Sequence, residues 1–138
     1  MTAPARPELC VGAIVVEDDH LLLIRRGHGP AAGFWSVPGG RVEAGELLAE
    51  AVVRELAEET GLEGVCGPLC GWVERIGDAY HYVILDFFVT VLDAGAALRA
   101  GTDADEAAWV PLHEVAERPL AEGLAEFLHE HGILDTIT

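Results

Sequence analysis

The sequence predicts an α/β fold in which a mixed sheet carries helices on both faces. Apolar, β-branched segments that predict strands stand before and after a central amphipathic helix, and a second helix is predicted near the end of the chain. No internal repeat or linker divides the 138 residues. We therefore expect one domain over residues 1–138, with residues 1–8, which include two prolines, as a loose N-terminal segment.

The first elements are predicted strands separated by turn-forming residues. Residues 9–16 are apolar and β-branched, and the Glu-Asp-Asp run at 17–19 supplies turn chemistry. Residues 20–26 are therefore expected to form the second strand of a hairpin. A loop with three glycines and a proline over 27–33 and a short strand over 34–37 follow.

The central helix is predicted over residues 47–60, which contain no Gly or Pro and are rich in Ala, Leu and Glu. Gly61 stands where a left-handed C-terminal cap is expected. At about 100° per residue, Leu48, Val52 and Leu56 fall in one apolar sector, which predicts the buried face of the helix.

The C-terminal half begins with two predicted antiparallel strands over residues 69–75 and 80–92, which turn near Gly77. The second of them is apolar on both faces in its middle, so we expect a central strand that is covered on both sides. A short strand over 107–110 follows, and Pro119 is expected in the first turn of the final helix.

Charge and composition exclude several classes of function. A net charge of −16 argues against binding to polymeric nucleic acid or to a membrane surface, which requires clusters of Lys and Arg. No apolar run approaches the roughly 20 residues that span a bilayer, and the N-terminus has no long apolar signal-peptide region. Three cysteines, an odd number, indicate reduced thiols. These features favour a cytoplasmic protein that has no membrane partner.

Three carboxylates of the predicted helix, Glu55, Glu58 and Glu59, are spaced i, i+3 and i+4, so they project from the same side. Like charges at this spacing destabilise a helix unless a ligand binds between them. Oxygen ligands suit hard cations, so the pattern indicates a site for Mg²⁺ or Mn²⁺. The alternative is a solvated acidic face, as most charge runs are.

The segment that holds these carboxylates resembles the Nudix box of the Nudix hydrolase family, G-x5-E-x7-R-E-U-x-E-E-x-G-U, where U is a bulky aliphatic residue. The segments GFWSVPGG and EAAWVPLHEV also look similar to family segments. The resemblance implies an α/β/α sandwich in which the box forms a loop, a helix and a second loop at the sheet edge. All nine fixed positions of the box match: Gly40, Glu46, Arg54, Glu55, Leu56, Glu58, Glu59, Gly61 and Leu62.

The resemblance also implies roles for the residues of the box. In the family the box carboxylates hold divalent metals that bridge a diphosphate, so Glu55, Glu58 and Glu59 become metal ligands, joined by the carbonyl of Gly40. Metals at this place would neutralise the phosphate charge and lower the pKa of a bound water. Glu46 and Arg54 are expected to support the site as an ion pair that holds the loop against the helix.

The general base must reach the attacking water, and the sequence leaves its identity open. Glu58 or Glu59 could serve. In other family members the base, or a further metal ligand, comes from a late loop, which here offers Asp103, Asp105 and Glu106. Glu106 is the preferred residue of these three, although a solvated acidic loop is an equally good interpretation.

Substrate contacts are expected from a few residues near the glycine-rich loop and in the strands. Arg25 or Arg26 could clamp a phosphate, and strand alternation allows at most one of the two to point into the site. His28 lies in the loop. Trp35 and Tyr82 offer flat surfaces for a base or a sugar, although aromatic residues in strands are more often core.

The predicted function is a metal-dependent hydrolase that cleaves the pyrophosphate bond of a nucleoside diphosphate linked to another moiety, with a slight preference for a nucleoside triphosphate. The alternative is an ADP-ribose or nucleotide-sugar pyrophosphatase. A subfamily of such enzymes carries a proline about sixteen residues after the box, where this chain has Gly77-Asp78-Ala79. A non-catalytic nucleotide-binding sensor is the alternative from another class, and such proteins usually lose box glutamates. Family habit also implies a homodimer.

Overall fold

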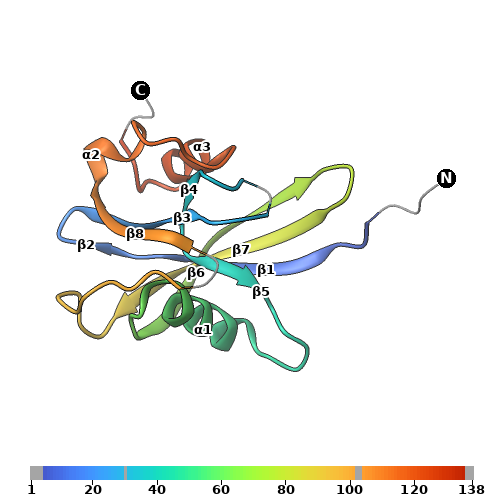
Figure 1. The fold of residues 1–138 in the computed structure, drawn as a ribbon, viewed down its shortest axis with the longest axis horizontal. Coiled ribbons are helices and arrows are strands. Elements are labelled where there is room, and N and C mark those ends of the chain that lie inside the picture. The colour runs from blue at the N-terminus through green and yellow to red at the C-terminus, as the bar shows by residue number, and fades with distance from the viewer. Residues whose placement is uncertain (1–4, 30, 102–103, 136–138) are drawn as a thin grey trace.

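The computed structural model describes residues 5–29, 31–101 and 104–135 and arranges them as two four-stranded sheets between helices. Helix α1 (Leu48–Thr60) lies on one side of the sheets, and the short helices α2 (Leu112–Val115) and α3 (Leu124–Glu130) lie on the other (Figure 1). The predicted α/β class with helices on both faces is confirmed, but the strands form two sheets instead of one.

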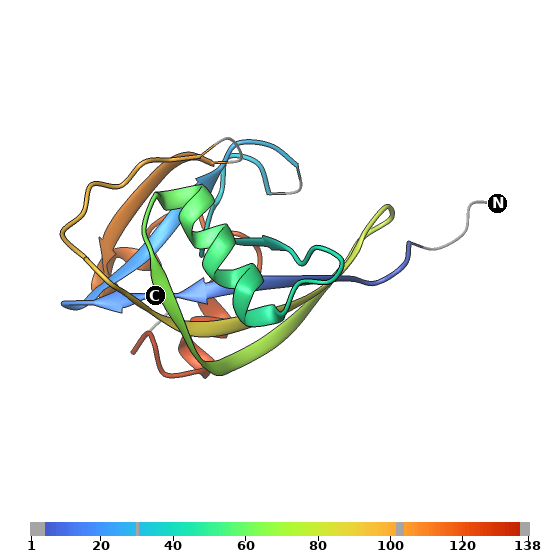
Figure 2. The ribbon, with the colours of Figure 1, turned by 90° about the horizontal axis from the view of Figure 1, so that it is seen from below.

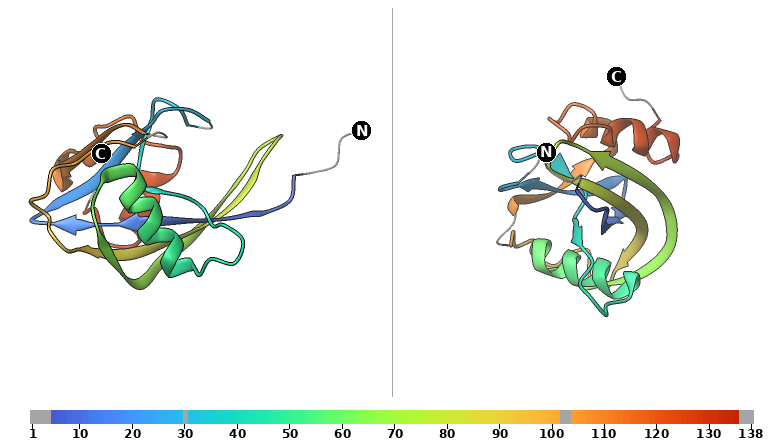
Figure 3. Two further views of the ribbon diagram at one scale, coloured as in Figure 1. Left: turned by 60° about the horizontal axis from the view of Figure 1, so that its bottom comes forward. Right: turned by 90° about the vertical axis from the view of Figure 1, so that its right-hand side faces the viewer.

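The first sheet has the strand order β5-β1-β7-β6. Strands β1 and β7 run parallel, whereas β5 and β6 pair antiparallel to their neighbours, so this sheet is mixed. The long β6–β7 hairpin curves from the α1 side to the α3 side of the molecule (Figure 3). The strands are β1 (Glu8–Ile14), β5 (Gly39–Arg41), β6 (Gly64–Ile76) and β7 (His81–Val91).

The second sheet is antiparallel: β3 pairs with β2, β4 and β8. The segment predicted as one strand over 9–16 is interrupted at Val15 and divides between the two sheets. The predicted hairpin therefore exists only between β2 and β3, around a turn in which Asp18 and Asp19 adopt φ angles of 49° and 59°. The strands are β2 (Val16–Glu17), β3 (His20–Arg26), β4 (Trp35–Ser36) and β8 (Ala104–Pro111).

Helix α1 begins and ends close to the predicted bounds. Gly61 has a φ of 78°, and its N–H donates to the carbonyl of Ala57, which is the expected left-handed cap. The helix lies across the strands of the first sheet (Figure 2) and buries Val52 and Leu56 completely. Its local sequence signals are strong, so its bounds were predictable.

Predictions for the C-terminal half need correction at four elements. Strand β6 begins at Gly64, five residues before the predicted start, because the pairing with β7 continues across irregularities around Gly67-Pro68. Strand β7 is central as predicted but is not covered on both faces, since Phe88 is 37% exposed. Strand β8 begins at Ala104, and α3 begins at Leu124, well after Pro119.

Two apolar clusters fill the space on either side of the sheets. Alternation along β3 sends Leu22 to the cluster under α1 and Leu21 and Leu23 to the cluster under α3. Residues 1–4 of the predicted loose N-terminus lie outside the described residues, and residues 5–7 form no strand. None of the described helices is long and apolar enough to cross a membrane.

Candidate active site

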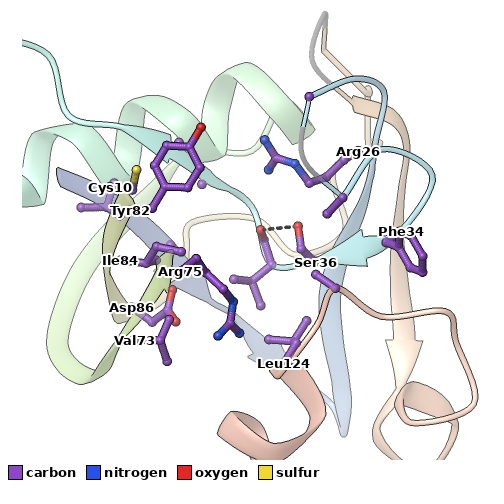
Figure 4. Close-up of a pocket in the computed structure, with 18 of the residues that line it drawn as sticks. Cys10, Arg26, Phe34, Ser36, Val73, Arg75, Tyr82, Ile84, Asp86 and Leu124 are labelled. Atoms are coloured by element: carbon purple, nitrogen blue, oxygen red, sulfur yellow. Dashed lines mark hydrogen bonds between the residues drawn. The ribbon is translucent and has the colours of Figure 1, made fainter. Parts of the chain in front are cut away.

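A cavity of about 840 Å³ lies where the two sheets, α1 and the segment before α3 meet. Strands β1, β5, β6 and β7 supply one wall, β3, β4 and the loop between them supply another, and residues 120–127 close a third side (Figure 4). Carboxylates of α1 stand at one part of the lining, and apolar and aromatic side chains form much of the rest.

The acidic part of the cavity is formed by Glu55 and Glu59, one helical turn apart on α1. Both are buried, with exposed fractions of 8% and 3%. Glu59 Oε1 accepts a hydrogen bond of 2.6 Å from the N–H of Gly39. A Cβ atom at Gly40 would lie only 2.6 Å from the carboxyl carbon of Glu55, so the missing side chain of Gly40 makes room for this carboxylate.

Arg54 connects the carboxylates of the helix with the loop before it. Its guanidinium donates to both oxygens of Glu46, at 2.7 and 3.0 Å, and through Nη1 to Glu55 at 2.9 Å and to Glu58 at 3.2 Å. The hydrogen bonds from Arg54, aided by the backbone N–H of Glu43, lower the pKa of Glu46 to about 2. The hydrogen bonds to Glu46 and then to Glu55 raise the pKa of Arg54, so Arg54 and Glu46 both stay ionised at any physiological pH.

The donor set suits a hard divalent cation. Carboxylates of Glu55 and Glu59 and the backbone of Gly40 present only oxygen ligands within one cavity, beside the space that a Cβ at Gly40 would fill. In the part of the chain that is described, no three acidic, His or Cys side chains already surround a common point. Glu58, whose side chain is 55% exposed, is turned toward Arg54 instead of the cavity. Only Oε2 of Glu58 accepts from Arg54, so the other carboxylate oxygen is not engaged by this bond.

Of the residues predicted to contact substrate, Arg26, His28 and Tyr82 line the cavity. Arg25, its neighbour on β3, lies outside the lining and approaches Asp105 at 3.9 Å, as the alternation of strand side chains requires. Of the two arginines considered on β3, Arg26 is the one whose side chain lines the cavity.

Two further predicted site residues, Trp35 and Glu106, lie away from the cavity. Trp35 is only 6% exposed and packs in the core under α3, with the guanidinium of Arg118 4.6 Å from the ring centroid. Its flat face is therefore already covered. Glu106 is exposed in β8, opposite Arg25 of β3, and belongs to a strand instead of the expected loop. Of the two other acidic residues considered there, Asp105 also lies in β8, and Asp103 lies outside the described residues.

Sequence reasoning overlooked several lining residues, of which Asp86 is the most unusual. It is 3% exposed on β7, and burial raises its pKa to about 7, against a smaller lowering by Arg75. A lone acidic residue within an apolar strand was the signal that could have found it. Cys10 also lines the cavity, but burial raises the pKa of its thiol to about 11, so it offers no thiolate at neutral pH.

The sequence of the whole chain is similar to known proteins of one family. The family model described as NUDIX domain matches residues 6–131. The chain is 40% identical over 111 residues to a protein named ADP-ribose pyrophosphatase from Methanocaldococcus jannaschii, covering 79% of this chain and 64% of the relative. It is 33% identical over 113 residues to the human protein named 8-oxo-dGDP phosphatase NUDT18, covering 77% of this chain and 33% of the relative.

Solved structures show the same fold. The MutT protein from Methanosarcina mazei Go1 superposes with a TM-score of 0.83 at 27% identity, covering 95% of this chain and 96% of that one. A MutT Nudix hydrolase from Burkholderia pseudomallei gives a TM-score of 0.79 at 29% identity, covering 90% and 97%. The chain thus spans less than two thirds of the two curated relatives described above but nearly all of these two structures.

Proposed function

This chain belongs to the Nudix hydrolase family, and on that premise we propose that it is a metal-dependent hydrolase of a nucleoside diphosphate linked to another moiety. The bond cleaved is the pyrophosphate bond, and a nucleoside monophosphate is the expected nucleotide product. One observation carries the proposal. Two buried carboxylates of a single helix, Glu55 and Glu59, open into the same cavity as Arg26 and an apolar lining that can receive a nucleoside.

The metal ligands we propose are Glu55, Glu58 and Glu59 with the carbonyl of Gly40, for Mg²⁺ or Mn²⁺. When bound, the metal supplies charge neutralisation for the diphosphate and a more acidic coordinated water. Arg54 and Glu46 fix the orientation of the carboxylates, because the guanidinium contacts Glu46, Glu55 and Glu58 together.

Side chains of the cavity supply positioning and proton transfer. Arg26 would pair with a phosphate oxygen, and Tyr82 and His28 would border the bound nucleotide. For the general base we propose Glu58 or Glu59, since both belong to the helix beside the reacting diphosphate. The position of Glu106 on β8, outside the cavity lining, gives it no comparable support.

For the substrate we propose a nucleoside triphosphate. A relative from Bacillus subtilis named putative 8-oxo-dGTP diphosphatase, 35% identical over 104 residues that cover 72% of this chain and 64% of the relative, supports this choice. The human relative is named for a nucleoside diphosphate. ADP-ribose or a nucleotide sugar is the second candidate, which the name of the archaeal relative favours. A sensor that binds a nucleotide without cleaving it is disfavoured because all box glutamates are present. A homodimer and a cytoplasmic location stay predictions.

The experiment that tests the proposal is a screen in which every product is identified by chromatography. Nucleoside triphosphates, ADP-ribose, nucleotide sugars and dinucleoside polyphosphates are incubated with the protein and either Mg²⁺ or Mn²⁺. Release of a nucleoside monophosphate that stops on addition of a chelator supports the proposal. Tight binding of a nucleotide without any product over hours would show a sensor instead.

A further inference from the structure

Asp86 is a buried carboxylate that faces the cavity and makes no hydrogen bond or ion pair with any residue that the structure describes. Among the described residues no hydrogen bond or ion pair ends on it, and its Oδ1 is fully buried without a partner. A buried charge is costly unless it is paired, so an unpartnered one at a binding cavity indicates a group kept for a ligand.

The chain provides room for this carboxylate with a glycine. Gly12 of β1 is the register partner of Asp86 on β7, and a Cβ atom at Gly12 would lie 2.0 Å from Asp86 Oδ1. Any other residue at position 12 would displace the carboxylate. Tyr82, Ile84 and Asp86 alternate along β7 and all line the cavity, so they share one face of the strand (Figure 4).

Arg75, the nearby cation, makes no hydrogen bond or ion pair with Asp86. Arg75 of β6 also lines the cavity, but its guanidinium donates to the carbonyls of Glu122 and Glu74. Arg75 therefore ties β6 to the segment before α3. The other side chains around Asp86 include Val73, Ile84 and Leu124, which form apolar walls suited to the faces of a flat ring (Figure 4).

The first sheet connects Asp86 with the acidic part of the cavity. Glu59 bonds the N–H of Gly39, and Gly39, Gly12 and Asp86 occupy one row across β5, β1 and β7. Two strand spacings put Asp86 about 10 Å from Gly39. The lining of one cavity therefore includes both the Glu59 carboxylate beside β5 and the Asp86 carboxylate on β7.

We propose that Asp86 recognises the base of the substrate nucleotide by accepting hydrogen bonds from its edge, and that the base is guanine-type. This inference rests on the proposed function, because it assumes a nucleotide in the cavity. An ionised carboxylate only accepts hydrogen bonds. Guanine offers the adjacent donors N1–H and the 2-amino group, whereas adenine and cytosine place a ring acceptor beside their amino group and uracil places its N–H between two carbonyls. Hypoxanthine is guanine without the 2-amino group and isolates that one contact.

The test compares the binding of GMP, IMP, AMP and UMP by isothermal titration calorimetry at pH 8.5, in the presence of Mg²⁺. The wild type should bind GMP about tenfold more tightly than IMP and also more tightly than AMP and UMP, since hydrogen bonds to a buried charged group are strong. In Asp86→Asn, which keeps the shape of the side chain, the difference between GMP and IMP should fall below about threefold. Asp78→Asn, the same change at an exposed residue of the β6–β7 turn, should leave the wild-type preference unchanged.

Two results would overturn the inference: equal binding of GMP and IMP by the wild type, or the same preference in Asp86→Asn as in the wild type. The first of these does not depend on the folding of any variant. The inference about base recognition and the proposed hydrolase activity can be refuted independently of each other. A guanine preference that depends on Asp86, in a protein that cleaves no nucleotide, sustains the base site and refutes the proposed activity. Cleavage of nucleotides without any preference for a base would support the proposed activity and refute the base site.

Discussion

Arg54 holds Glu46, eight residues earlier, through two hydrogen bonds of 2.7 and 3.0 Å, one to each carboxylate oxygen. The same guanidinium donates to the backbone carbonyl of Arg41, so it binds the loop at both of its ends. Glu55 and Glu58 receive its remaining Nη1 contacts. One planar group therefore holds the loop that follows β5, the strand of Gly40, against the helix that carries the carboxylates.

The first prediction concerns this arrangement. A lysine has one donor head and cannot reproduce a fork that serves four oxygen-bearing partners, so Arg54→Lys should misplace the carboxylates. We expect activity and Mg²⁺ affinity to fall by roughly 10- to 100-fold. Steady-state kinetics and metal titration calorimetry measure both, with Arg99→Lys, an exposed arginine, as the control. Wild-type values in Arg54→Lys would show that the fork is dispensable.

The second prediction separates the roles of the helix carboxylates. Glu59→Gln keeps an oxygen that can accept the Gly39 N–H, so the fold should persist while a charged ligand is lost. Within the described parts of the chain, the side chain of Glu58 hydrogen-bonds only to Arg54, so Glu58→Gln should fold equally well. Metal-dependent turnover should be abolished in both variants and kept in Glu63→Gln, an exposed control just after the helix. Normal turnover in both test variants would refute the assigned roles.

The third prediction tests the close approach of β5 to α1. A methyl group at position 40 would stand 2.6 Å from the carboxylate of Glu55, whose surroundings are packed, so Gly40→Ala must shift one of the two. A displacement near 1 Å in a catalytic site costs about 100-fold in rate. Gly95→Ala, where the nearest atom to the added carbon is 3.4 Å away, serves as the matched control. Equal rates for both alanine variants would contradict the placement of Glu55 at the reacting groups.

Local signals in the sequence predicted α1 and its box well, since capping, propensity and the i, i+3, i+4 spacing all act within a few residues. The pairing of strands that are far apart in the chain leaves weaker signals in the amino-acid sequence. The break at Val15 that divides one apolar segment between two sheets depends on what β1 and β2 pair with. Trp35 is of a residue type that can serve as a flat surface for a ligand. Only its tertiary contact with Arg118 shows that its ring is covered. Asp86 was missed because its meaning depends on Gly12, 74 positions away in the chain but adjacent in the sheet.

The fourth prediction follows from the raised pKa of Asp86. Burial takes this pKa from 3.8 to about 7, so between these values the folded protein binds a proton that the unfolded chain has released. The stabilising contribution of this proton is complete below about pH 3.8 and is lost as the pH rises through about 7. The wild type should therefore lose free energy of unfolding from this group as the pH rises, by up to about 4 kcal/mol.

Asp86→Asn has no such titration, because the amide stays neutral at every pH. The free energy of unfolding of Asp86→Asn minus that of the wild type should therefore increase from pH 5 to pH 8.5, measured by urea denaturation in the presence of a reductant. Using this difference cancels the titrations of all other groups that the two proteins share. Asp78→Asn, exposed on the same hairpin, should give a difference that is nearly constant with pH. If Asp86→Asn also gave a constant difference, Asp86 would titrate equally in the folded and unfolded states, and its carboxylate would be solvated instead of buried in the cavity wall.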